Sequence, residues 1–178
     1  MKAVVISDIH GSGYYAQKIK EINEKEKPDK IILLGDLYYH GPRNNLSQEY
    51  NPMKVAEILN SLKEKLLVVR GNCDAEVDEM ISEFKFNEHI LMNINEKNFY
   101  FTHGHRYNIE NIPYEDFDIM IYGHIHQGFI QEKEGLIFAN PGSISLPKCN
   151  TAHSYIVLEN RKIILKDVDG KIIQEYEY

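Results

Sequence analysis

The first half of the chain alternates short apolar runs with stretches of helical periodicity. The apolar runs end in polar residues or glycine, as buried strands do, at 3–6, 30–34 and 66–69. Apolar residues between them recur every three or four positions, which predicts a helix that ends before Pro28 and another that starts at Asn51 and Pro52. This order of elements predicts parallel strands. A third helix is predicted over 77–84, with Asp74 as its N-cap.

Beyond about residue 90 the helical periodicity largely disappears. Short β-type runs follow at 99–102, 119–122, 136–139, 155–158, 163–168 and 172–176. Asp169 and Gly170 fit a two-residue hairpin turn between the last two runs, because such turns need positive φ angles. The two halves together predict a mixed α/β fold, in which two β-sheets pack face to face with helices on their outer surfaces.

Composition narrows the class of protein. The chain has 178 residues, 43% apolar and 26% charged, which predicts one globular domain spanning 1–178. Its 20 basic and 27 acidic residues give a net charge of -7, which argues against long nucleic acid or an anionic membrane as a partner. No apolar run is long enough to span a bilayer and no cleavable signal is visible, so we expect a cytoplasmic protein. Two cysteines, Cys73 and Cys149, are too few for a disulfide framework, and we expect free thiols.

Polar residues that can bind metals follow the predicted strands, where each strand ends. They are Asp8, His10, Asp36, Asn72, His103, His105, His124 and His126. Ligands bind outside the carboxyl ends of strands in α/β sheets, so these side chains are expected to meet in one crevice. The alternative is scattered polarity: Asp8 capping a turn beside a solvent-facing His10, and ordinary Gly-Asp and Gly-Asn turns at 35–36 and 71–72. Mixed nitrogen and oxygen ligands without thiolate favour first-row divalent metals.

The ordered blocks at these strand ends resemble those of the calcineurin-like metallophosphoesterase superfamily. The blocks are Asp8 to His10, Gly35 to Asp36, Gly71 to Asn72, His103, and Gly123 to His126. Three further segments are similar to the YfcE-type subgroup of bacterial phosphodiesterases: Asn72 to Asp74, Gly41 to Leu46 (GPRNNL) and Asn140 to Ser143 (NPGS). The family resemblance implies a four-layer αββα sandwich of two mixed β-sheets flanked by helices.

The resemblance also implies a dinuclear metal centre. One metal would be held by Asp8, His10, Asp36 and His126, and the other by Asp36, Asn72, His103 and His124. Asp36 would bridge the two ions. Mn²⁺ is the first choice of metal, with Fe²⁺, Zn²⁺ and Ni²⁺ as alternatives. Such a centre implies in-line attack of a metal-bridging hydroxide on a small phosphodiester.

The proton donor to the leaving group stays open. Many family members carry histidine after the asparagine of the third block, whereas this chain has Cys73. That thiol is either a poor acid or a small packed residue, and His105 or a metal-bound water is the alternative donor.

Arg43 and Arg70 are the candidate cations for phosphate oxygens, because a guanidinium can bind two of them. Arg43 could instead form a loop salt bridge or a subunit contact, and Arg70 could neutralise a neighbouring carboxylate. Asn44 and the loop 140–143 are candidates for hydrogen bonds to substrate or to ligand histidines.

Two function classes remain open on the sequence. The first is a metal-dependent hydrolase of small phosphodiesters or phosphomonoesters, and the second is a non-catalytic scaffold or binding module of the same fold. The polar loop 38–51 carries Leu46 and three tyrosines, so it is either a lid over the substrate or a contact in a homo-oligomer.

Overall fold

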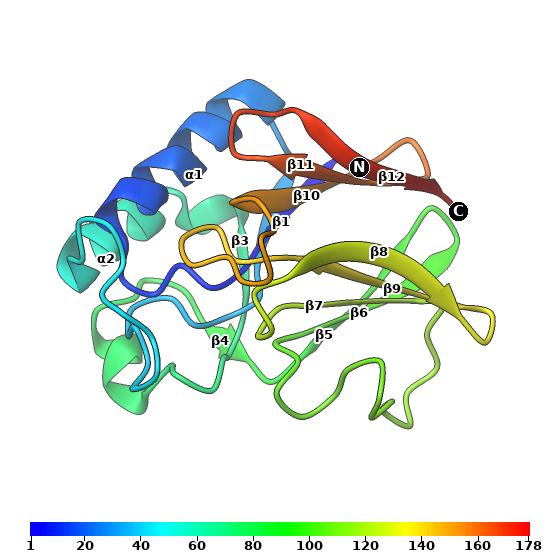
Figure 1. Ribbon diagram of the computed structural model, residues 1–178, viewed down its shortest axis with the longest axis horizontal. Coiled ribbons are helices and arrows are strands. Elements are labelled where there is room, and N and C mark those ends of the chain that lie inside the picture. Colours follow the sequence, from blue (N-terminus) through cyan, green and yellow to red (C-terminus); the bar gives the residue numbers. More distant parts are fainter.

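The computed structural model describes all residues from 1 to 178 (Figure 1). Its elements in chain order are β1 (Ala3–Ile6), α1 (Gly13–Glu26), β2 (Lys30–Leu33), α2 (Pro52–Ser61), η1 (Lys63–Lys65), β3 (Leu66–Val69), η2 (Glu76–Met80), β4 (Phe86–Asn87), β5 (Ile90–Ile94), β6 (Lys97–Thr102), β7 (Ile119–Tyr122), β8 (Gly128–Lys133), β9 (Leu136–Pro141), β10 (Ser154–Glu159), β11 (Lys162–Asp167) and β12 (Ile172–Glu177).

The strands form two mixed sheets. One has seven strands in the order β12-β11-β10-β1-β2-β3-β4, and the other has five in the order β5-β6-β7-β9-β8. β1, β2 and β3 are parallel, as the alternation of strands and helices predicts. β6, β7 and β9 are also parallel to one another, so the second sheet likewise gathers several strand ends at one edge.

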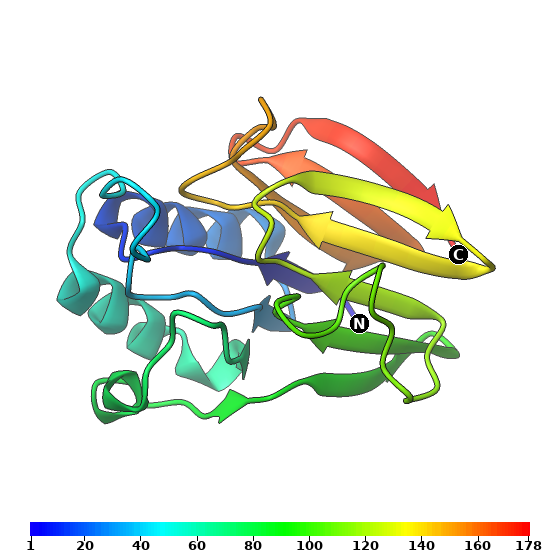
Figure 2. The same cartoon turned by 60° about the horizontal axis from the view of Figure 1, so that its bottom comes forward.

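The two sheets pack face to face and enclose one apolar core (Figure 2). Strand alternation in β1 sends Ala3 and Val5 into this core, and Val4 and Ile6 into a second core beneath α1 and α2. The predicted mixed α/β sandwich of two sheets is therefore confirmed. Its outer layers differ: both α-helices cover the seven-stranded sheet, whereas segment 103–118 covers the other sheet through a small aromatic cluster.

Both long helices start where the sequence places them. The side chain of Ser12 accepts a hydrogen bond from the Tyr15 N–H at the start of α1. Asn51 caps α2 in the same way, and Pro52 occupies its first turn, where a missing N–H costs nothing. These caps fix the N-terminal ends of the two helices that cover the seven-stranded sheet.

Two local predictions are corrected by the structure. Segment 77–84 forms only the short 3₁₀ helix η2, and Asp74 does not cap it but binds backbone N–H groups at the ends of β2 and β3. The last hairpin has four residues between its strands, of which only Gly170 has positive φ. Asp167 causes the longer turn, because its side chain accepts hydrogen bonds from the N–H groups of Asp169 and Lys171.

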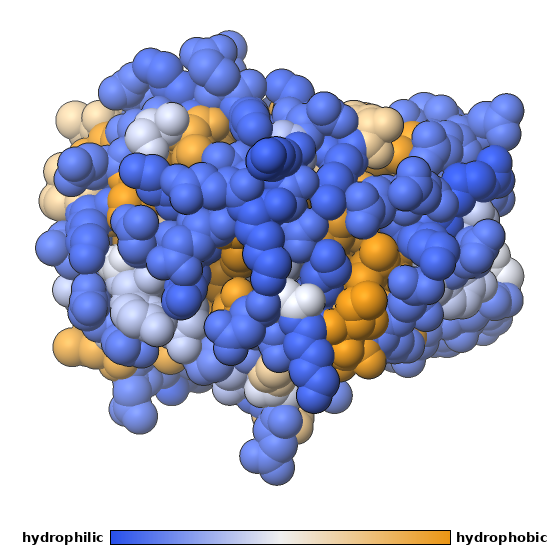
Figure 3. Space-filling model, turned by 90° about the horizontal axis from the view of Figure 1, so that it is seen from above, coloured by the Kyte–Doolittle hydropathy of each residue, from blue (hydrophilic) through white to orange (hydrophobic).

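The surface seen from above Figure 1 is largely hydrophilic, with apolar patches between hydrophilic side chains (Figure 3). Ile172 and Ile173 on the edge strand β12 are about half exposed. Neither helix combines the length and the apolar character that a membrane span requires.

Glu26, at the end of α1, is the centre of a buried ionic cluster, which predicts that the stability of the fold decreases in acid. Its carboxylate accepts hydrogen bonds from Tyr155 Oη at 2.9 Å, Lys166 Nζ at 2.9 Å and Lys2 Nζ at 2.8 Å. Burial opposes ionisation, but these donors outweigh it and lower the pKa of Glu26 from 4.5 to about 2. Because the folded state holds this proton more weakly than the unfolded chain, the cluster stabilises the fold above pH 4.5 and progressively less down to pH 2.

We expect Glu26→Gln to lower the free energy of unfolding by about 2 kcal/mol at pH 7. The difference from the wild type should shrink as the pH falls from 4.5 toward 2. Urea unfolding at pH 7 and pH 3 measures it, with Glu24→Gln, an exposed position on the same helix, as the matched control. An equal deficit at both pH values would contradict this account of the cluster.

Candidate metal centre

All seven predicted metal ligands lie at one edge of the two sheets, where the parallel strands end. The ligand atoms of six of them form two groups, Asp8 with His10 and His126, and Asp36 with His103 and His124. Within each group the atoms lie within 4.8 Å of one another. Residues separated by up to 118 positions therefore meet because β1, β2, β6 and β7 all end at this edge.

In the first group, two histidines face one buried carboxylate. His10 Nε2 lies 3.1 Å from His126 Nε2, and Asp8 Oδ1 lies 3.6 Å and 3.3 Å from these two nitrogens. All three residues are at most 2% exposed. Such a cluster places three ligand atoms around a single point that solvent barely reaches.

Asp36, in the second group, also faces a histidine of the first group. Asp36 Oδ1 lies 3.4 Å from His103 Nε2, while Asp36 Oδ2 lies 3.7 Å from His10 Nε2. Asn72 Oδ1 is 3.0 Å from His103 Nε2, so the amide joins the second group. Asp36 thus stands between the two groups, as a bridging carboxylate must.

Three of the histidines are oriented by backbone carbonyls. The Nδ1 atoms of His10, His103 and His126 donate to the carbonyl oxygens of Tyr39, Leu34 and Leu146, at 2.6 to 2.7 Å. A carbonyl only accepts, so each Nδ1 carries a proton, and in the neutral form of each ring the Nε2 lone pair points toward the cluster. This is the arrangement that metal-ligating histidines adopt.

The donor set fits divalent cations. Neutral His10 and His126 would bring two lone pairs to 3.1 Å with no proton between them, and Asp8 Oδ1 is buried without a hydrogen-bond partner. Facing acceptors repel unless a positive charge lies between them. Imidazole nitrogens together with carboxylate and amide oxygens are ligands of first-row divalent metals.

The backbone at the site is held in an uncommon conformation. Asp8, His10, Asp36, His124 and His126 have φ angles between 49° and 67°, in the left-handed region. Side chains other than glycine occupy it at a cost of about 1 kcal/mol or more each. The fold therefore accepts a loss of stability at these five residues, and this backbone conformation sets the directions of their side chains.

The surroundings of the cluster shift the pKa values of two of its histidines in opposite directions. Burial opposes the charged form of His103, but Asp36 and Asp8 outweigh it and raise its pKa to about 9. Burial and the positive charge of His103 lower the pKa of His124 to about 4. The two carboxylates therefore attract positive charge to the centre of the site, and His124 stays neutral at pH 7.

Asp74 has a positioning contact that the sequence did not reveal. Its buried carboxylate accepts hydrogen bonds from the N–H groups of Asp36 and Leu37 at 2.8 Å and of Gly71 at 2.7 Å. Gly71 also packs too closely on Asp36 to allow any side chain there. Asp74 therefore ties the end of β2, which carries Asp36, to the end of β3, which precedes Asn72.

The NPGS segment and the nearby Ser145 hold the loops that carry the ligands, through hydrogen bonds to backbone carbonyls. Asn140 Nδ2 donates to the Gly123 carbonyl, and the hydroxyls of Ser143 and Ser145 donate to the Asp8 carbonyl at 2.7 and 2.9 Å. These contacts are all buried and bind backbone groups. The segment thus holds ligand-bearing loops in place, and its buried polar groups are not available to a substrate.

The predicted catalytic residues do not all reach the cavity of about 360 Å³ that lies beside the ligands. Arg43 and Cys73 line it, whereas Arg70 pairs with Glu79 and lies 5.3 Å over the ring of Phe86. Arg70 therefore pairs with a carboxylate outside the cavity, which is the alternative role that the sequence left open for it.

The two candidate proton donors differ in position. Burial and the nearby Asp36 raise the pKa of the half-buried Cys73 thiol to about 12, so the thiol stays protonated at pH 7. The exposed His105 ring lies 5.4 Å from that of His103 and 6.3 Å from that of His124, outside the lining of the cavity. Cys73 thus lines the cavity, while His105 lies near His103 and His124 but outside the lining.

A cavity of about 360 Å³ opens over the two groups of ligands. Its lining includes His10, Asp36, Asn72, His124 and His126, together with Tyr39, Gly41, Pro42, Arg43, Asn44, Cys73 and Lys148. Lys148 was missed by the sequence analysis. The signal was available, since Lys148 follows the NPGS segment by only five residues, but the spacing alone does not show which way the loop turns.

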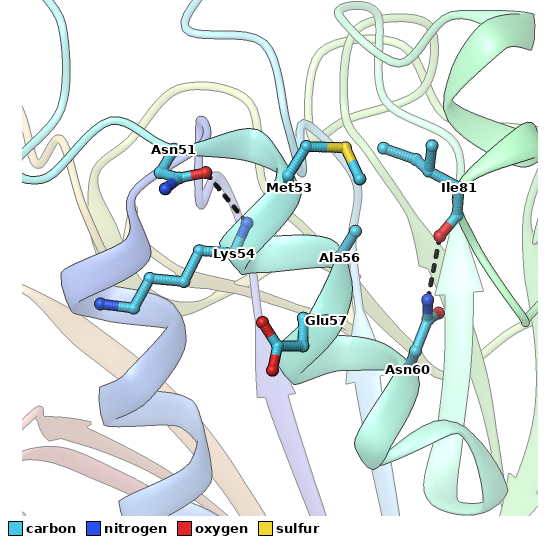
Figure 4. A pocket seen from close by; sticks show the side chains of 7 residues that line it. All are labelled: Asn51, Met53, Lys54, Ala56, Glu57, Asn60 and Ile81. Atoms are coloured by element: carbon cyan, nitrogen blue, oxygen red, sulfur yellow. Dashed lines mark hydrogen bonds between the residues drawn. The ribbon is translucent and has the colours of Figure 1, made fainter.

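A larger cavity, of about 630 Å³, lies between α2 and Ile81 (Figure 4). Asn60 Nδ2 donates to the Ile81 carbonyl at 2.9 Å and closes one side. Lys54 and Glu57 are its only charged lining residues, and it contains no cluster of metal ligands. Size therefore does not identify the functional site in this molecule, whereas convergent polar groups do.

Comparison with known proteins defines the class. The family described as the calcineurin-like phosphoesterase superfamily domain matches residues 1–162. The chain belongs to this family, which confirms the resemblance inferred from the strand-end blocks. Membership implies divalent metal ions as cofactors, in agreement with the two groups of ligand atoms.

Within the family, the chain is similar to phosphodiesterase YfcE of Escherichia coli strain K12. The two are 39% identical over 164 residues, which cover 90% of this chain and 88% of YfcE. The solved structure of YfcE, a phosphoesterase from E. coli, superposes with a TM-score of 0.95 over 99% of this chain and 98% of that chain, at 35% identity. The probable metallophosphoesterase YsnB of Bacillus subtilis strain 168 is 28% identical, over 89% of this chain and 83% of YsnB.

Proposed function

We propose that this chain is a divalent-metal-dependent phosphodiesterase that hydrolyses small phosphodiesters. The observation that carries the proposal is the two groups of ligand atoms beside one cavity, with Asp36 facing a histidine of each group. The similarity to phosphodiesterase YfcE over most of both chains supports diesters as the substrate. Asp8, His10, Asp36 and His126 would hold one cation, and Asp36, Asn72, His103 and His124 the other.

The size of the cavity supports a small substrate. A volume of about 360 Å³ lies near the lower end of the range for small-molecule pockets. The net charge of -7 opposes the approach of a long polyanion. A phosphate ester with two compact alcohol groups fits both observations.

Two divalent cations at such a site activate water and neutralise the charge that develops on phosphate. The chain itself orients the ligands before substrate arrives, because backbone carbonyls fix three imidazole rings and Asp74 fixes the loop of Asp36. Arg43 and Asn44 lie in the wall of the cavity, where they can donate to phosphate oxygens. We propose Mn²⁺ as the native metal, with Fe²⁺, Zn²⁺ and Ni²⁺ to be compared directly.

The proposed function predicts metal-dependent hydrolysis of bis(p-nitrophenyl) phosphate. Chelation should abolish release of nitrophenol and added Mn²⁺ should restore it. His124→Ala should lower the rate by about a hundredfold or more, because it removes a ligand of the second cation. His89→Ala, which changes a histidine outside the cavity, is the matched control and should retain activity.

The result separates the function classes. Hydrolysis that survives thorough chelation, or that does not depend on His124, would overturn the proposal. Faster turnover of p-nitrophenyl phosphate than of the diester would indicate a phosphomonoesterase. Metal binding without turnover of either ester would indicate a binding module.

A further inference from the structure

Two cations in the wall of the cavity have no partner within the protein. Arg43 and Lys148 both line it, and neither side chain forms an ion pair or a hydrogen bond in the structure. Arg70, by contrast, is neutralised by Glu79. Arg43 and Lys148 are the only arginine and lysine side chains in the lining of the cavity.

The loop that carries Lys148 is anchored to a ligand. The Lys148 N–H donates to the His126 carbonyl at 2.9 Å. Cys149 and Asn150 both have left-handed φ angles, and the Thr151 hydroxyl returns to the Lys148 carbonyl at 2.8 Å. This tight turn fixes the backbone of Lys148 directly beside the first group of ligands.

The position of Lys148 complements that of Arg43. Arg43 belongs to the loop after β2, whereas Lys148 belongs to the loop after β9, and both loops lie at the end of the sheets where parallel strands stop (Figure 1). Two separate loops thus bring one positive charge each to the same cavity. An anion entering it meets positive charge from both, in a protein whose overall charge repels anions.

We propose that Lys148 binds the anionic phosphate of the substrate and sets the affinity of the site for phosphate esters. This inference rests on the proposed function. Lysine is a compact point charge on a flexible stem, and Lys148 is exposed, so it attracts the anion without demanding one geometry. It therefore acts on binding and leaves the chemical step largely unchanged.

The test compares Lys148→Met with Lys148→Arg and Lys171→Met. Methionine removes the charge and keeps the length, arginine keeps the charge, and Lys171 is an exposed lysine at the β11–β12 turn without a side-chain partner. Both methionine variants change the net charge equally. Calorimetry with inorganic phosphate on Mn²⁺-loaded protein gives the dissociation constant, and bis(p-nitrophenyl) phosphate gives KM and kcat separately.

Lys148→Met is expected to weaken phosphate binding and to raise KM about fivefold, with kcat within about twofold of the wild type. Lys148→Arg and Lys171→Met should stay within about twofold on both measures. Equal effects of the two methionine variants would overturn the inference, as would weaker Mn²⁺ binding by Lys148→Met, which would show an effect through His126. If no ester is hydrolysed by the wild type, the proposed function fails, and phosphate binding still decides the role of Lys148.

Discussion

Asp36→Asn is expected to lower the hydrolysis of bis(p-nitrophenyl) phosphate by on the order of a thousandfold. Asp36 is the one carboxylate that faces both groups of ligands, with Oδ1 toward His103 and Oδ2 toward His10. Asparagine has nearly the same shape but lacks the negative charge, so both proposed cations lose a ligand at once. Initial rates with saturating Mn²⁺, and Mn²⁺ affinity by calorimetry, measure the two consequences.

Asp116→Asn is the matched control, because Asp116 is exposed on the segment that covers the second sheet. It should keep the rate and the metal affinity of the wild type. If Asp36→Asn loses activity but binds two Mn²⁺ ions with unchanged affinity, Asp36 does not bridge them and the assignment of ligands is wrong.

Asp74→Ala is expected to lower the free energy of unfolding by about 3 to 5 kcal/mol. The substitution leaves the N–H groups of Asp36, Leu37 and Gly71 without their acceptor at a buried position. Each such group costs about 1 to 3 kcal/mol. Urea unfolding of the metal-free protein, followed by circular dichroism, measures the loss without a contribution from bound metal.

Asp78→Ala provides the comparison for Asp74→Ala. Asp78 also accepts a backbone hydrogen bond, from the Ala75 N–H at 2.8 Å, but it does so for one donor at the exposed start of η2. Its loss should cost about 1 kcal/mol. Similar costs for the two variants would show that Asp74 does not join the ends of β2 and β3 in the way described.

Much of the fold could be predicted because most strands carry their own signal, although no run was predicted at β4, β5 or β8. Apolar runs ending in polar residues located β1, β2 and β3, and the helical period located α1 and α2. The prediction of an α-helix over 77–84 was wrong. The apolar spacing there is that of a helix, but the hydrogen bonds of Asp74 hold the preceding chain in a loop, and only the 3₁₀ helix η2 forms. The irregular cover of the second sheet could not be foreseen, since segment 103–118 packs aromatic residues on it without a regular period.

The candidate ligands could be predicted because histidine and aspartate at strand ends are few and ordered. The sequence could not predict which basic side chains line the cavity, because this depends on ion pairs between distant segments. Arg70 pairs with Glu79, whereas Lys148, before the turn at 149–150, has no such partner. The left-handed backbone conformation of Asp8 and His126 could not be predicted either, since glycine is the residue that usually marks such a conformation in a sequence. Whether loop 38–51 is a lid or a contact between subunits stays a prediction.

The central claim is that seven side chains from strand ends far apart in the sequence hold two divalent cations. Anomalous diffraction from a crystal soaked in Mn²⁺ tests it most directly. We predict two peaks, one among Asp8, His10 and His126 and the other among Asp36, His103 and His124. A crystal with no manganese at these residues, or with a single ion bound away from Asp36, would contradict the account.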